Sequence, residues 1–65
     1  MIEFKEGKNG KIKVIDNFGE VLGKIVYIDW SGEYVFFSKQ TIFDSNNLRY
    51  ITFKLEALNA PSNNP

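Results

Sequence analysis

Carboxylates are the side chains of this sequence best suited to acid and base catalysis, because histidine and cysteine are both absent. Without them a serine has no imidazole base, and no thiolate nucleophile, disulfide or thiolate metal site can form. Two of the eight carboxylates could in principle pair as in glycoside hydrolysis. However, Asp16, Asp29 and Asp44 fall at expected turns or a helix start, and the glutamates alternate with apolar residues on expected strands. The sequence therefore predicts that the protein is not an enzyme and has no catalytic, cofactor or metal site.

Aromatic side chains between residues 25 and 38 could stack on the bases of a single-stranded nucleic acid: Tyr27, Trp30, Tyr34, Phe36 and Phe37. Such platforms usually carry interleaved Lys or Arg, but this segment has none and contains Asp29 and Glu33. Lysines cluster instead between residues 5 and 13, in an alternation typical of a solvated edge strand. The formal net charge is zero, so no long-range field attracts nucleic acid. We therefore do not expect nucleic acid as a partner, and a single-stranded nucleic-acid-binding module that uses sheet aromatics is the alternative function.

The first two strands are expected to form a hairpin. Residues 2–6 alternate apolar and charged side chains, "GKNG" interrupts the alternation, and residues 11–16 resume it. A three-residue loop, Lys8–Gly10, with its glycine in the left-handed conformation, pairs Phe4 with Val14. A two-residue loop would place the apolar side chains of the two strands on opposite faces, so the three-residue loop is favoured.

A second hairpin contains the most apolar part of the chain. The turn "DNFG" leads to a third strand over about residues 20–30. If Ser31–Gly32 form a two-residue loop to a fourth strand, Tyr27 pairs with Phe36. Both faces of this hairpin are apolar over their middle, and no register makes either face polar.

The C-terminal part of the chain fits a helix better than a strand. Apolar residues at i, i+3, i+7 and i+10 form one helical stripe: Leu48, Ile51, Leu55 and Leu58. Asp44 or Ser45 can cap the N-terminus of this helix. The segment "YITFKLE" also alternates as a strand would, but the longer helical match and the helix-forming "KLEAL" outweigh that alternation.

Together these elements predict one α+β domain over residues 1–60, a four-stranded antiparallel β-meander with the C-terminal helix packed on one face. Residues 61–65, rich in Pro and Asn, are expected to form a disordered tail. A small SH3-like barrel is the alternative fold. The expected core comprises Phe4, Ile12, Val14, Ile25, Tyr27, Phe36, Leu48, Ile51, Leu55 and Leu58.

One motif spans the last two-thirds of the chain: a Gly-x-Ile strand, a Tyr-x-Phe strand and a helix ending in L-x-x-I-x-x-x-L-x-x-L-N. Its matching positions are Gly23, Ile25, Tyr34, Phe36, Leu48, Ile51, Leu55, Leu58 and Asn59. In this motif the chain resembles short uncharacterised proteins of tailed phages, cyanobacterial phages among them. Thr52 and Phe53 depart from the small or charged helix formers usual in that group. The resemblance implies the fold, a phage origin and a host partner, but no activity.

The second apolar face of the sheet is expected to lack a cover, because a single helix covers one face. This self-association face would comprise Ile15, Val26, Ile28, Trp30, Val35 and Phe37. The alternative is that the loop before the helix covers the face with Ile42 and Phe43, but two side chains are too few to bury so many. A two-fold axis makes such a patch self-complementary, so the sequence predicts a homodimer.

The remaining expectations concern other partners and location. Arg49, Tyr50 and Phe53 lie outside the helical stripe and form the expected contact with a partner macromolecule. No apolar run approaches the roughly 20 residues that span a bilayer, and no leader is evident, so we expect a cytoplasmic protein, in the host cytoplasm if phage-encoded. The expected function is a small non-enzymatic interaction protein that self-associates through its sheet and binds a host macromolecule.

Overall fold

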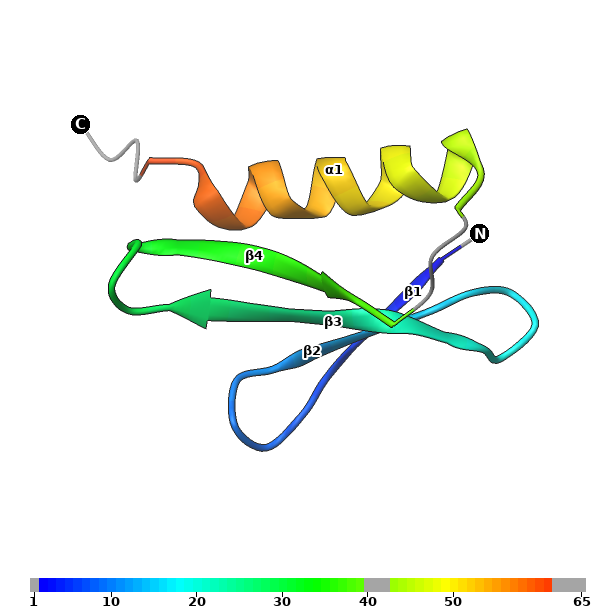
Figure 1. Ribbon diagram of the computed structural model, residues 1–65, viewed down its shortest axis with the longest axis horizontal. Coiled ribbons are helices and arrows are strands. Elements are labelled where there is room, and N and C mark those ends of the chain that lie inside the picture. The colour runs from blue at the N-terminus through cyan, green and yellow to red at the C-terminus, as the bar shows by residue number, and fades with distance from the viewer. Residues whose placement is uncertain (1, 40–42, 62–65) are drawn as a thin grey trace.

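The computed structural model describes residues 2–39 and 43–61 of the chain. The described elements are, in order, β1 (Glu3–Glu6), β2 (Ile12–Ile15), β3 (Val21–Ile28), β4 (Glu33–Ser38) and α1 (Ser45–Asn59). The strands form one open antiparallel sheet in the order β1-β2-β3-β4, and α1 lies over one face of it (Figure 1). The predicted α+β meander is confirmed, and the SH3-like barrel is excluded because the sheet does not close. Of the predicted tail, residues 62–65 lie outside the described residues.

The β1–β2 hairpin has the register predicted from the sequence. Phe4 lies opposite Val14, and the N–H of Gly7 donates to the carbonyl of Lys11 at 2.7 Å. The loop is therefore Lys8–Gly10, and its last residue has a φ of 73°. This left-handed value is accessible to glycine without a Cβ penalty, which is why the loop ends there.

A β-bulge between β2 and β3 changes which side chains enter the core. Val14 lies opposite Gly23 and Ile15 opposite Val21, so Leu22 is the extra residue on β3. Simple alternation from Gly23 would point Leu22 away from the helix, but the bulge turns its side chain inward, and Leu22 is buried. Sequence alternation misses this core residue because a bulge breaks the two-residue period.

The β3–β4 turn is longer than predicted. Ile28 lies opposite Glu33, so four residues connect the strands, and Tyr27 faces Tyr34 instead of Phe36. A two-residue type I′ turn needs positive φ at both of its central residues. In this turn only Gly32 has a positive φ, at 73°, so the turn is of another type. The predicted register is therefore wrong by two residues. A shift of two preserves the face of every side chain, so the prediction of two apolar faces survives it.

Helix α1 begins where the sequence predicts. The carboxylate of Asp44 accepts a hydrogen bond from the N–H of Asn47 at 2.7 Å, which makes Asp44 the N-cap. The buried residue of the helix is Ile51, and Leu55 and Leu58 pack beside it at the edge of the core. The alternative strand assignment for this segment is wrong.

The core lies between α1 and the sheet and differs from the predicted core in its outer members. The buried side chains are Ile2, Ile12, Val14, Leu22, Ile25 and Ile51, with Phe4, Tyr34, Phe36, Phe43, Leu55 and Leu58 packed against them. Tyr27 and Leu48, predicted as core, are 47% and 46% exposed. Tyr27 lies near the end of the hairpin, where its ring packs edge-on against Tyr34 with centroids 5.2 Å apart.

Asn59, the last residue of α1, fastens the helix to the free edge of the sheet. Its side-chain Oδ1 accepts from the N–H of Tyr34 at 2.7 Å, and its Nδ2 donates to the carbonyl of Tyr34 at 3.0 Å. The amide thus reproduces the two hydrogen bonds that a neighbouring strand would make with β4. This contact satisfies both outward backbone groups of one edge residue, and such groups otherwise invite pairing with another chain.

We expect Asn59→Ala to lower the free energy of unfolding by about 1–2 kcal/mol, because two hydrogen bonds are lost and water can replace them only in part. Urea denaturation followed by circular dichroism measures the loss. Asn46→Ala is the matched control, since Asn46 lies exposed in the first turn of the same helix. Equal losses in the two variants would mean that the Asn59 contact with Tyr34 does not hold the helix.

Candidate binding face of the sheet

The face of the sheet opposite α1, here called the outer face, carries both lysine and apolar side chains. Along β3 its residues are Val21, Lys24, Val26 and Ile28, with the bulge after Val21. No described element lies over this face in Figure 1. The outer face is therefore the part of the described sheet available to a partner.

A row of three lysines and one aromatic ring crosses the outer face from edge to edge. Lys5 of β1 lies opposite Lys13 of β2, Lys13 lies opposite Lys24 of β3, and Lys24 lies opposite Phe37 of β4. The Nζ of Lys24 is 5.9 Å from the centroid of the Phe37 ring, a cation–π distance. We call these four residues the lysine row.

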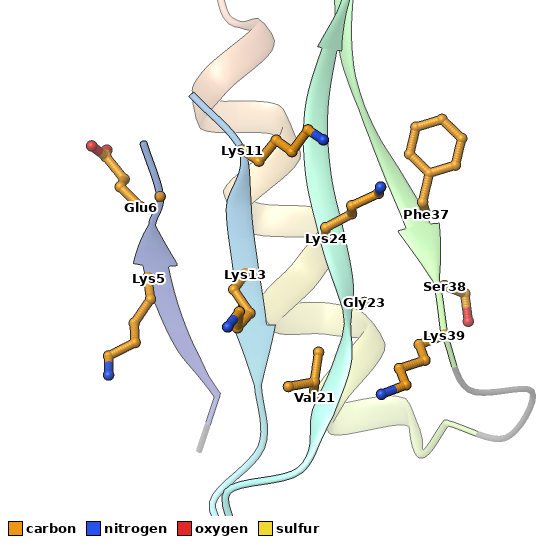
Figure 2. Close-up of a pocket in the computed structure, with 11 residues that line it drawn as sticks. Lys5, Glu6, Lys11, Lys13, Val21, Gly23, Lys24, Phe37, Ser38 and Lys39 are labelled. Atoms are coloured by element: carbon orange, nitrogen blue, oxygen red, sulfur yellow. The ribbon is translucent and has the colours of Figure 1, made fainter. Parts of the chain in front are cut away.

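The lysine row lies in a shallow hollow of about 730 Å³. Lys11, just before β2, and Lys39, just after β4, also line it, so its walls carry lysines from all four strands or their ends (Figure 2). The acidic residue in the lining is Glu6. Five of the eight cationic residues of a chain with zero net charge thus gather in one hollow, and all five are exposed.

An apolar strip occupies the other end of the outer face, toward the β3–β4 turn. Val26 of β3 lies opposite Val35 of β4. On the same face, Ile28 is the next residue along β3 and Phe37 is the next residue along β4. Val26, Ile28 and Val35 are half-buried by their neighbours, whereas Phe37 is 47% exposed. We call these four residues the apolar strip, which shares Phe37 with the lysine row.

The other two residues predicted for self-association, Trp30 and Ile15, are not part of the apolar strip. Trp30 is not on a strand, because β3 ends at Ile28; it lies in the turn and is 90% exposed. Ile15 lies opposite Glu3 at the far end of the sheet. The lysine row separates Ile15 from the apolar strip, so the predicted face is not one continuous apolar surface.

The aromatic residues considered for base stacking are divided between two sides of the molecule. Phe37 is on the outer face, while Phe36 and Tyr34 pack against the core under the helix. A single stacking platform that contains all the sheet aromatics is therefore not formed within the described residues. What the sequence did not indicate is that Lys24 lies beside Phe37 and Lys13 beside Lys24, because the three residues belong to different strands.

Phe43, just before the helix, contributes to the core and not to the outer face. The rings of Phe43 and Phe36 pack edge-on with centroids 5.9 Å apart, beneath α1. Ile42 lies outside the described residues. Phe43 therefore does not cover the apolar strip.

The helix residues predicted to contact a partner remain on the surface. Arg49 is exposed, Tyr50 is partly exposed, and Phe53 is 60% exposed. Lys54, which follows Phe53, turns toward the sheet with its Nζ 5.4 Å from the centroid of the Phe4 ring. Phe53 thus stays on the outward side of α1.

Residues 2–39 and 43–61 contain no group of three His, Cys, Asp or Glu side chains placed to hold a metal ion. Within those ranges, no helix has the length and apolar character needed to cross a bilayer. Comparisons of the chain with protein-family models, with curated proteins and with solved structures find no match.

Proposed function

We propose that the protein is a small non-enzymatic interaction protein that forms a homodimer through the apolar strip. The observation that carries the proposal is the pair Val26 and Val35, flanked by Ile28 and Phe37 on a face that no described element covers. A two-fold axis beside this pair, toward Ile28, would set the strip of one copy against the strip of the other. Trp30, at the adjacent turn, is close enough along the chain to extend the contact.

The burial of these residues indicates a weak dimer. Burial of a fully exposed large apolar side chain contributes about 1.5–3 kcal/mol. Val26, Ile28 and Val35 are already half-buried, so most of the gain comes from Phe37 and Trp30. Association itself costs at least about 4 kcal/mol, so we expect a dissociation constant of about 1 µM or higher.

The lysines limit how the two copies can be arranged. A fully overlapping pair of sheets would bring Lys13 and Lys24 of one copy toward the same residues of the other, and like charges repel. The axis is therefore expected near Ile28, at the end of the sheet away from the lysine row. This arrangement leaves the three lysines of the row open to solvent.

The proposal also includes a contact with a host macromolecule through Arg49, Tyr50 and Phe53. Its support is the exposure of these side chains on α1, on the opposite side of the sheet from the apolar strip. A dimer formed by outer faces would present one such surface on each copy.

The dimer is tested by replacing both valines of the central pair in the variant Val26→Thr/Val35→Thr. Threonine keeps the β-branched shape and strand propensity, so the fold is retained while the strip becomes polar. Sedimentation equilibrium should give the wild type a mass that rises with concentration toward twice 7.5 kDa. The variant should dissociate at least about tenfold more readily, which corresponds to about 1.4 kcal/mol.

Phe18→Thr serves as the control, because it removes a larger exposed apolar side chain at the β2–β3 turn. A wild type that stays at 7.5 kDa up to about 1 mM would overturn the homodimer. So would a Phe18→Thr variant that dissociates as readily as the double threonine variant, since association would then not depend on the apolar strip.

A further inference from the structure

We propose that the lysine row binds single-stranded nucleic acid, with its lysines on the phosphates and Phe37 under a base. The carrying observation is the register that sets Lys5, Lys13, Lys24 and Phe37 side by side across all four strands. The lysine contacts do not depend on the homodimer, but Phe37 belongs to both the lysine row and the apolar strip, so base stacking on Phe37 and dimerisation compete for its ring. It also differs from a platform of sheet aromatics, because one ring and several lysines make the site.

The lysine row is unfavourable in the free protein. Strands of a sheet lie about 4.8 Å apart, and like charges directly opposite each other destabilise the pair. Lys5, Lys13 and Lys24 form two such pairs in succession. No salt bridge joins these lysines to carboxylates within residues 2–39 and 43–61. A bound polyanion would remove this repulsion, so its binding is coupled to the stability of the sheet.

The surrounding charges favour an anionic ligand. Lys11 and Lys39 extend the positive surface on both sides of the lysine row, while Glu6 is the acidic residue of the lining. Figure 2 draws these lysines on the same side of the sheet as Phe37. Among the other carboxylates, Glu3 and Glu33 lie at the two ends of the outer face, opposite Ile15 and Ile28 and outside the hollow, while Asp16 is at the β2–β3 turn and Glu56 on α1. The charge is thus separated in space although it sums to zero.

The exposed ring decides between single-stranded nucleic acid and other polyanions. Every unpaired base can stack on an aromatic ring, whereas the bases of a duplex already stack on each other and the Asp and Glu side chains of an acidic peptide carry no ring. Phe37 lies at the end of the lysine row and is about half exposed, with Lys24 beside its ring. A single strand of nucleic acid that crosses the sheet along the lysine row would therefore place its phosphates on the lysines and, at the end of the row, one base on Phe37.

The test is fluorescence anisotropy of a labelled oligothymidylate of about 12 nucleotides, titrated with wild-type protein at several salt concentrations. Each neutralised phosphate of a single strand contributes about −0.7 to the slope of log K against log salt concentration. For wild type we expect a slope of about −2 to −3.5, from three to five lysines. Lys13→Gln/Lys24→Gln should reduce its magnitude by about 1.4.

Two further variants separate this site from general charge attraction. Lys8→Glu changes the net charge by the same amount at one exposed position outside the hollow, and its slope should stay within about 0.5 of wild type. Phe37→Leu keeps an apolar side chain but removes the ring, so affinity should fall at least about fivefold with an unchanged slope. Unfolding would not account for weaker binding by Lys13→Gln/Lys24→Gln. This variant relieves the repulsion between the lysines, so its melting temperature should rise at low salt.

Three outcomes would overturn the proposal. The first is an equal loss in Lys8→Glu and in Lys13→Gln/Lys24→Gln, which would indicate attraction without a site. The second is tighter binding of a duplex or of polyglutamate than of the oligothymidylate, together with no effect of Phe37→Leu; the hollow would then receive another kind of polyanion. The third is no salt-dependent binding of the wild type at all.

Discussion

Gly23→Ala is expected to destabilise the protein by about 3 kcal/mol or more. A Cβ on Gly23 would lie 2.8 and 2.9 Å from Cε1 and Cζ of Phe36, and it would clash with the backbone carbonyl of Phe37. The ring of Phe36 can turn only by disturbing the core, and the carbonyl belongs to the paired strand β4, so neither clash is easily relieved. A domain of this size has a free energy of unfolding of only about 3–5 kcal/mol, so the variant should be largely unfolded. Circular dichroism and urea denaturation measure this.

Gly7→Ala is the matched control for that substitution. A Cβ at Gly7 would lie 3.4 Å from the carbonyl oxygen of Lys11, an ordinary contact, so we expect a change within about 0.5 kcal/mol. A folded Gly23→Ala variant that loses less than about 1 kcal/mol would mean that β3 and β4 are not as close at Gly23 as described.

Ile51→Ala is expected to reduce the free energy of unfolding by about 2–4 kcal/mol. Ile51 is the buried residue of α1 and belongs to the core cluster of the sheet. Alanine has the higher helix propensity, so the loss measures packing alone and not helix formation. Since the helix packs on the sheet chiefly through Ile51, Leu55 and Leu58, it should fray or detach before the sheet unfolds. Urea denaturation followed by helical circular dichroism tests this.

Leu48→Ala tests whether Leu48 is as buried as the helical stripe in the sequence predicts or half exposed as in the structure. Leu48 and Ile51 are equal members of the predicted stripe, but Leu48 is nearly half exposed at the N-terminal end of the helix. We expect Leu48→Ala to cost about 1 kcal/mol or less. Comparable losses for the two substitutions would mean that the whole stripe, including Leu48, is in contact with the sheet.

Local patterns in the sequence were sufficient for the elements of the fold. The alternation before and after "GKNG" specified a hairpin because one turn type sets both its glycine conformation and its register, and Phe4 does lie opposite Val14. The helix and its Asp44 cap were predictable because propensity, periodicity and capping act within a few residues of one another.

Tertiary structure decided what the sequence left open. The bulge that buries Leu22 and the turn that places Tyr27 opposite Tyr34 depend on how one strand fits another, which no residue-by-residue period encodes. The site depends on the same fit. Lys13, Lys24 and Phe37 are separated by at least ten residues in the chain, and only strand pairing across the sheet brings them into one row. Composition fixed a net charge of zero, but the fold determined where the charges gather, because pairing in a sheet sets the neighbours of a side chain independently of their distance along the sequence.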